Sequence, residues 1–191
     1  MCARYLIDEN TAAEMRQILS ELDERHSVST GEIYPTNIAP IICHDGVTAI
    51  QWGFPQWTGK GVIINARSET ALEKVTFRKP MLESRCVVPC SGFFEWQSVA
   101  GKKKKAKYFL NRPDKDILYL AGAYSAFRDA DDEYLAFVIL TTAASASVAE
   151  IHDRMPVILD DDDIEPWLND THFIEDVLRR TGSELQSELY R

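Results

Sequence analysis

Apolar side chains near the start of the chain recur at the spacing of an α-helix. Thr11 followed by Glu14 is the pattern of a capping box, in which the two side chains satisfy backbone N–H groups of the first helical turn. The apolar positions beyond it are three or four residues apart: Met15, Ile18, Leu19 and Leu22. The pattern predicts an amphipathic helix over residues 12–25 that packs on a sheet.

Short segments rich in valine, isoleucine, tyrosine and phenylalanine dominate the rest of the chain. Such segments, when bounded by glycine, proline or charged turns, are typical of β-strands. We expect strands at 47–52, 61–65, 85–96, 107–111, 117–127 and 134–142. A short helix is expected over 143–151, and another is expected to begin at the acidic run 160–163.

Strands outnumber helices and do not alternate with them, which predicts an α+β fold. We expect a curved, largely antiparallel sheet or barrel-like core with flanking helices. The 191 residues suit one domain over 1–191, and no repeat or low-complexity linker divides them.

Two charged runs admit simple structural interpretations. Gly101 and the lysines at 102–105 lie between two expected strands, so they indicate a hairpin tip that is either a solvated turn or a DNA contact. The aspartates at 160–163 are interpreted as a helix cap in preference to a metal site.

The net charge of −9 is unevenly distributed along the chain. Residues 1–107 carry 14 lysines and arginines against 12 acidic residues, whereas residues 108–191 carry 7 against 18. Phosphate binding depends on lysine and arginine, so a nucleic-acid surface is expected only as a local basic groove in the first half. No apolar run is long enough to span a membrane, and the first ten residues lack a secretion leader, so we expect a cytoplasmic protein.

The four cysteines do not suggest a disulfide framework, because a cytoplasmic setting would keep them reduced. They are Cys2, Cys43, Cys86 and Cys90. Three residues separate Cys86 from Cys90, in place of the two of a zinc knuckle, so no metal site is expected.

Cys2 offers two nucleophiles once Met1 has been removed. The α-amine has a reference pKa of about 7.7–8.0, so part of it is neutral near pH 7 and attacks aldehydes. The thiol can then add to the iminium carbon and close a five-membered thiazolidine. The alternative is that Cys2 is a small buried residue at the start of a strand.

Three compact polar clusters have the composition of an active site: 65–69, 92–96 and 152–156. Glu95 stands among aromatic residues, so an inward orientation would raise its pKa, as suits an acid–base group. An outward orientation into solvent is the alternative. His152 is either a proton donor or a capping residue, and Asp153 with Arg154 could form a local ion pair.

These clusters, in this order, resemble the SRAP family, which includes bacterial and eukaryotic abasic-site processing proteins. The matching stretches are 1–5, 36–40, 52–55, 65–70, 85–89, 92–96, 140–142 and 152–159. The resemblance implies an SRAP-like fold and a lyase-like Schiff-base chemistry, in which Cys2 forms a covalent thiazolidine crosslink with an abasic site. The implied partner is single-stranded DNA containing abasic sites, with no cofactor, no metal and no membrane. We expect a monomer that associates with the nucleoid during DNA damage.

The resemblance also implies roles for individual residues. Cys2 is similar to the nucleophile, Asn65 to the amide that orients the cysteine amine and the sugar, Glu95 to the catalytic carboxylate and His152 to the acid that assists ring opening. The phosphate-binding arginines implied are Arg4, Arg67 and Arg154. Trp52 and Pro40 correspond to places where the DNA is kinked or a base is stacked.

Two departures from the family pattern stand near the reacting groups. Ala3 replaces the usual glycine and adds a methyl group close to the amine, and Phe94 replaces a tyrosine beside Glu95. Alanine is small, so we expect activity to be retained.

Two other functions fit some of the same residues. A cysteine peptidase or amidase could use Cys2, Glu95 and His152, including removal of its own Met1, but would not need the three arginines. A non-covalent DNA-binding module would need the arginines and not Cys2.

Overall fold

The computed structural model describes residues 2–8, 17, 18, 20, 22, 29–101, 103–129 and 132–190. Most of the helix expected over 12–25, including its capping box, lies outside the described residues. Gln17, Ile18 and Ser20 are helical, and Ile18 is buried.

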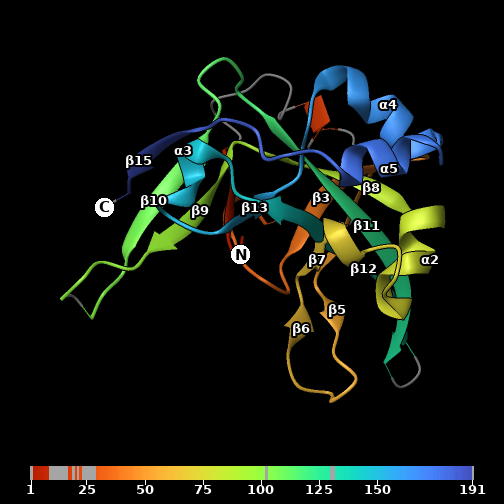
Figure 1. Ribbon diagram of the computed structural model, residues 1–191. Helices are drawn as coiled ribbons and strands as arrows, with labels where there is room; N and C mark the ends of the chain where they lie inside the picture. The colour runs from red at the N-terminus through yellow and green to blue at the C-terminus, as the bar shows by residue number, and fades with distance from the viewer. Residues whose placement is uncertain are drawn as a thin grey trace.

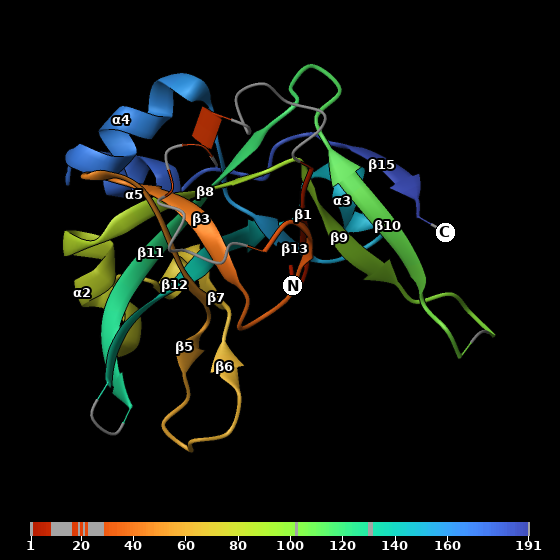
Figure 2. The same ribbon diagram turned by 180° about the vertical axis from the view of Figure 1, so that it is seen from behind.

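Five strands close into a barrel, which confirms the α+β prediction with a barrel-like core (Figures 1 and 2). They are β3 (Ile38–Cys43), β4 (Gly46–Trp52), β8 (Arg85–Cys90), β11 (Leu118–Asp129) and β12 (Asp132–Ala143). All neighbours are antiparallel except β4 and β12, which run parallel where Gln51 faces Ala136. The short strands β7 (Asn65–Arg67), β13 (Arg154–Pro156) and β14 (Ile158–Leu159) add to this sheet.

A second, five-stranded sheet stands beside the barrel. Its order is β15 (Gln186–Leu189), β10 (Ala106–Asn111), β9 (Gly92–Gln97), β1 (Tyr5–Ile7) and β2 (Gly31–Ile33). The prediction of one strand over 85–96 was therefore wrong, because the chain leaves the barrel at Ser91 and β9 enters the second sheet. Gly92 permits this crossing, since a Cβ there would lie 2.5 Å from the Phe109 ring and 2.6 Å from the Leu110 carbonyl oxygen.

The segment expected as one strand over 61–65 is likewise divided. β5 (Phe54–Pro55) and β6 (Val62–Ile63) form a small hairpin, and β7 begins two residues later. The other strand predictions agree with β4, β10, β11 and β12 to within a few residues.

Helices cover the outside of the barrel: α2 (Val75–Glu83), α4 (Asp161–Asn169) and α5 (Phe173–Leu178). The helix expected over 143–151 is only the single turn α3 (Ala146–Ala149), and a 3₁₀ turn, η1, covers Ser68–Thr70. α2 was not predicted, because it contains Pro80 and lacks a clear apolar stripe. No helix formed by the described residues is long and apolar enough to cross a membrane.

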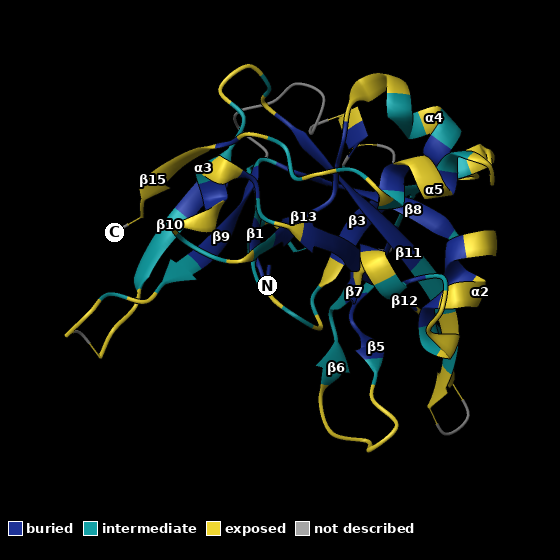
Figure 3. Cartoon of the chain, in the orientation of Figure 1, coloured by how far each residue is buried: buried dark blue, intermediate teal, exposed yellow. Residues whose placement is uncertain are grey.

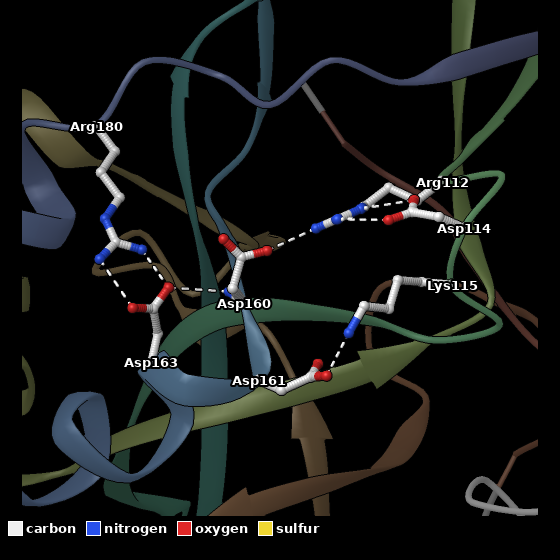
Figure 4. Close-up of polar contacts among 7 residues, drawn as sticks. All are labelled: Arg112, Asp114, Lys115, Asp160, Asp161, Asp163 and Arg180. Atoms are coloured by element: carbon white, nitrogen blue, oxygen red, sulfur yellow. Dashed lines mark hydrogen bonds and ion pairs between the residues drawn. The ribbon is translucent and has the colours of Figure 1, made fainter.

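The acidic run is the start of α4, as expected, and Asp160 is its N-cap. The Asp160 N–H donates to Asp163 Oδ2 at 2.9 Å, which is one half of a capping box. Figure 4 shows that basic residues from other segments neutralise this run: Arg112 contacts Asp160 at 2.6 Å, Lys115 pairs with Asp161, and Arg180 pairs with Asp163.

Barrel strands are mostly buried, whereas the hairpin tips are exposed (Figure 3). Trp52 is central to the packing between the two sheets. Its ring lies 5.1 Å from that of Tyr5 in the second sheet and 6.4 Å from that of Phe137 in the barrel. This junction fixes β1, and with it the adjoining Cys2, against the barrel wall.

Candidate active site

Cys2 lies just before β1, at the junction of the two sheets, and its side chain is completely buried. β1 pairs antiparallel with β9: Tyr5 faces Phe93, and the Phe94 N–H donates to the Arg4 carbonyl at 2.9 Å. Continuing this register places residues 2–4 alongside the part of β9 that carries Glu95.

Asn65 approaches Cys2 from the barrel side. It opens β7, which runs parallel to β12 with Asn65 opposite Ile139. The Asn65 Nδ2 donates to the Cys2 carbonyl oxygen at 2.9 Å. Asn65 Oδ1 is buried and has no hydrogen-bond partner among the described residues. An amide oxygen in this position can accept a hydrogen bond from an amine on the same backbone.

Glu95 points inward with only 2% of its surface exposed, so the structure selects the buried one of its two expected orientations. Burial raises the pKa of the Glu95 carboxyl, and the nearby His152 partly opposes that rise. Burial also raises the pKa of the Cys2 thiol well above its usual value, and the charge of Glu95 raises it further. The thiol and the carboxyl are therefore close enough to interact, and the pKa of each is raised.

His152 follows α3, and its N–H donates to the Val148 carbonyl at 3.0 Å. Its ring Nδ1 accepts from the Arg154 N–H at 3.0 Å and lies 2.8 Å from Asp153 Oδ1. A single ring nitrogen cannot accept and donate at once, so the two contacts require different placements of the ring proton. An Nδ1 without a proton accepts from the Arg154 N–H, and an Nδ1 that carries a proton donates to Asp153.

The three predicted phosphate-binding arginines have different surroundings. Arg67 is exposed, two residues from Asn65. Arg4 Nη1 pairs with Glu32 at 3.1 Å. The Arg154 guanidinium forms a two-pronged pair with Glu69 and donates to the Thr141 carbonyl at 2.6 Å.

Trp52 and Pro40 are both buried, which contradicts their assignment to base stacking or DNA kinking. Trp52 has no exposed surface, and its Nε1 donates to the Ile64 carbonyl at 3.1 Å, so it is a packing residue. The exposed indole is instead that of Trp57, which is 94% accessible in the loop between β5 and β6. Trp57 was not predicted from the sequence, although a tryptophan in a short turn of polar residues and glycine is an unusual signal.

The fold agrees with that of known proteins. The model of the family SOS response associated peptidase (SRAP) matches residues 1–190. The chain belongs to the SRAP family. The abasic site processing protein YoqW of Bacillus subtilis is 31% identical over 94% of this chain and 85% of its own length. The abasic site processing protein YedK of Escherichia coli is 32% identical over 65% of this chain and 56% of its own.

Crystal structures support the SRAP fold at lower identity. A protein of Bordetella bronchiseptica superposes with a TM-score of 0.82 over all of both chains at 22% identity. A protein of Bacteroides thetaiotaomicron superposes with a TM-score of 0.79 at 25% identity, over all of this chain and 92% of its own.

Within this SRAP chain, the four predicted catalytic residues come from distant segments. Cys2, Asn65 and Glu95 meet where β1, β7 and β9 approach one another, and His152 lies close enough to Glu95 to influence its charge. Arg4 and Arg67 are each two residues from a member of this group, as is Arg154. Glu32 and Glu69, which hold two of these arginines, were not assigned a role from the sequence, although Glu69 lies within the polar cluster 65–69.

Proposed function

We propose that this protein recognises abasic sites in single-stranded DNA and crosslinks to them through Cys2, forming a thiazolidine that shields the lesion from strand cleavage. The observation that carries the proposal is the placement of Cys2. Its carbonyl is held by Asn65, and its thiol is buried beside the Glu95 carboxyl. The abasic site processing proteins among its relatives give independent support.

The proposed reaction needs no oxidant or reductant. After removal of Met1, the neutral amine of Cys2 attacks the aldehyde carbon of the ring-opened deoxyribose and forms a carbinolamine. Protonation of the carbinolamine hydroxyl and loss of one water give the iminium ion. The thiol sulfur then adds to the iminium carbon and its proton returns to the carboxylate that protonated the hydroxyl, so that the net reaction joins amine, thiol and aldehyde with release of one water.

Asn65, Glu95 and His152 supply orientation and proton transfer in this scheme. Asn65 Oδ1 accepts a hydrogen bond from the freed amine and directs its lone pair toward the aldehyde. Glu95, whose pKa is raised, protonates the departing hydroxyl and then accepts the thiol proton as the ring closes. His152 protonates the sugar ring oxygen during ring opening.

DNA binding in this proposal depends on phosphate contacts and not on base sequence. Arg4, Arg67 and Arg154 lie around the cluster, and guanidinium groups match phosphate in two-pronged geometry. Trp57 offers an exposed ring on which an unpaired base can stack. Specificity then comes from the aldehyde and from the need for single-stranded character.

The environment of the thiol favours crosslinking over peptidase activity. A cysteine peptidase needs a thiolate, which requires an electropositive site and a lowered pKa. Burial and Glu95 raise the pKa of the Cys2 thiol instead. In the proposed reaction the amine makes the first attack, so a protonated thiol is no obstacle.

Mixing the protein, with Met1 removed, and a single-stranded oligonucleotide carrying one abasic site tests the proposal. We expect a slower band on a denaturing gel that survives heating and is absent with undamaged DNA. Intact mass should equal protein plus DNA minus one water, and peptide mapping should locate the adduct on Cys2.

Two variants separate the amine from the thiol. Cys2→Ser keeps the amine and should give only a labile imine that borohydride traps, whereas Cys43→Ser should crosslink as the parent does. A heat-stable adduct formed by Cys2→Ser without borohydride would contradict the thiazolidine.

A further inference from the structure

The lysine-rich hairpin tip has no part in the chemistry proposed above. Lys103, Lys104 and Lys105 are exposed, and none of them forms an ion pair with another described residue. Several other cations are neutralised internally, such as Arg154 by Glu69. The three lysines therefore present their full charge to solvent, on a chain whose net charge is −9.

This tip belongs to the same hairpin as the catalytic carboxylate. Strands β9 and β10 pair antiparallel, with Tyr108 opposite Glu95 and Ala106 opposite Gln97. Lys104 is four residues before Tyr108, a distance of roughly 13 Å along an extended strand. Figures 1 and 2 show the loop between β9 and β10 projecting from the body of the molecule.

The base of the hairpin is attached to the site at a second point. The Gln97 Nε2 donates to the Glu150 carbonyl oxygen at 2.8 Å, two residues before His152. The direction of the hairpin is thus set relative to both Glu95 and His152.

Cations and aromatic rings alternate along the flank of this hairpin. The Arg4 guanidinium lies 3.9 Å from the centre of the Tyr34 ring and 5.2 Å from that of Trp96. Lys107 Nζ lies 4.5 Å from the centre of the Tyr190 ring. Tyr34 and Tyr190 are 43% and 40% exposed. Rings beside cations are the usual surface for single-stranded nucleic acid.

Glu32 joins the two cations of this row. Its carboxylate contacts Arg4 at 3.1 Å and Lys107 Nζ at 2.6 Å. One carboxylate offsets one of the two positive charges, so the row keeps one positive charge, and the lysine tip adds three more.

We propose that the β9–β10 hairpin is a DNA-binding arm, a surface that rests on the proposed function and extends it. Lys103, Lys104 and Lys105 bind phosphates of the strand on one side of the lesion, and the row from Tyr34 to Tyr190 receives bases nearer the lesion. The arm thereby holds the flanking strand while Glu95, at its base, meets the reacting sugar.

Replacing the three lysines with glutamine in the full chain tests the arm. We expect the half-saturating concentration of a long abasic oligonucleotide to rise by about tenfold, and the slope of log affinity against log salt to become shallower by about 2. The crosslinking rate at saturating DNA should stay unchanged. An unchanged half-saturating concentration and an unchanged salt slope would contradict the proposed DNA-binding role of the hairpin.

A matched pair of single variants distinguishes the loss of a positive charge at this hairpin from the loss of a positive charge at another hairpin. Lys104→Gln should weaken binding, whereas Arg128→Gln, at the exposed end of the β11–β12 hairpin, should not. Shortening one flank of the oligonucleotide to about two nucleotides should abolish the difference between the triple variant and the parent, because the strand no longer reaches the tip. A difference that persists with both flanks shortened would also overturn the arm.

Failure of the proposed function gives a different result. If the parent forms no crosslink, non-covalent binding to undamaged single-stranded DNA still compares the triple variant with the parent. Equal affinities of the parent and the triple variant for undamaged DNA would contradict the DNA-binding role of the hairpin, whether or not the crosslink forms. Weaker binding by the triple variant would support that role.

Discussion

Burial raises the pKa of the Glu95 carboxyl above its usual range. Removal of the side chain from water penalises the carboxylate, while His152 favours it. The folded protein therefore binds a proton on Glu95 at pH values where the unfolded chain has lost it. Stability contributed by this group is present at low pH and is lost as pH rises through its raised pKa.

Glu95→Gln should lower the crosslinking rate by about 10²- to 10⁴-fold, because the amide cannot transfer the proton. The parent rate should fall on the alkaline side as Glu95 ionises, and the variant should lose that limb of the pH profile. Single-turnover crosslinking measured across pH checks both outcomes.

Stability provides the control for this substitution. Because glutamine carries no charge to desolvate, Glu95→Gln should raise the free energy of unfolding at pH 8 and change it little at pH 4. A variant destabilised at both pH values would mean that its lost activity reflects misfolding.

At the level of elements, Arg85 bridges the ends of α2 and α4, two helices that are far apart in the sequence. Its buried guanidinium donates to the Met81 and Leu82 carbonyls at the end of α2, both at 3.0 Å. It also reaches the Leu168 carbonyl at the end of α4, at 3.3 Å. These carbonyl groups lack helical partners, so one side chain on β8 satisfies both helix ends.

Arg85→Met should lower the free energy of unfolding by about 2–4 kcal/mol, because it leaves several carbonyl groups without donors. Arg78→Met, on the exposed face of α2, should change it by less than about 0.5 kcal/mol. Urea denaturation compares the two. Equal effects would show that Arg85 does not hold the helix ends.

At the scale of the whole molecule, the two sheets share their packing. Trp52 contacts Tyr5 and Phe137, which belong to different sheets, and β8 continues into β9 across Ser91. Arg112 and Arg180 pair with the start of α4, so part of the acidity of residues 108–191 is neutralised locally.

Unfolding should therefore be a single cooperative transition of one domain. Trp52→Ala should lower its free energy by about 3–5 kcal/mol and shift the far-ultraviolet dichroism and tryptophan fluorescence curves together. Two separated transitions, with only one moved by the substitution, would show that the sheets unfold independently.

Local sequence patterns were sufficient to predict the fold class and several of the strands of this protein. Alternating β-branched and aromatic segments predicted the α+β class and the positions of β4, β10, β11 and β12, because strand formation depends on a period of two residues. The cap at Asp160 was also predictable from the local sequence, because its partner Asp163 is only three residues away. The chemistry available to Cys2 follows from its covalent structure and its place after Met1.

Contacts between distant segments decided the rest. Whether Glu95 faces inward depends on β1 and on His152, and no pattern within β9 contains that information. The division of 85–96 at Ser91 and the burial of Trp52 depend on which sheet each strand joins. Sequence periodicity shows how apolar and polar side chains alternate along a segment. Only the packed fold determines which other residues each face of that segment contacts.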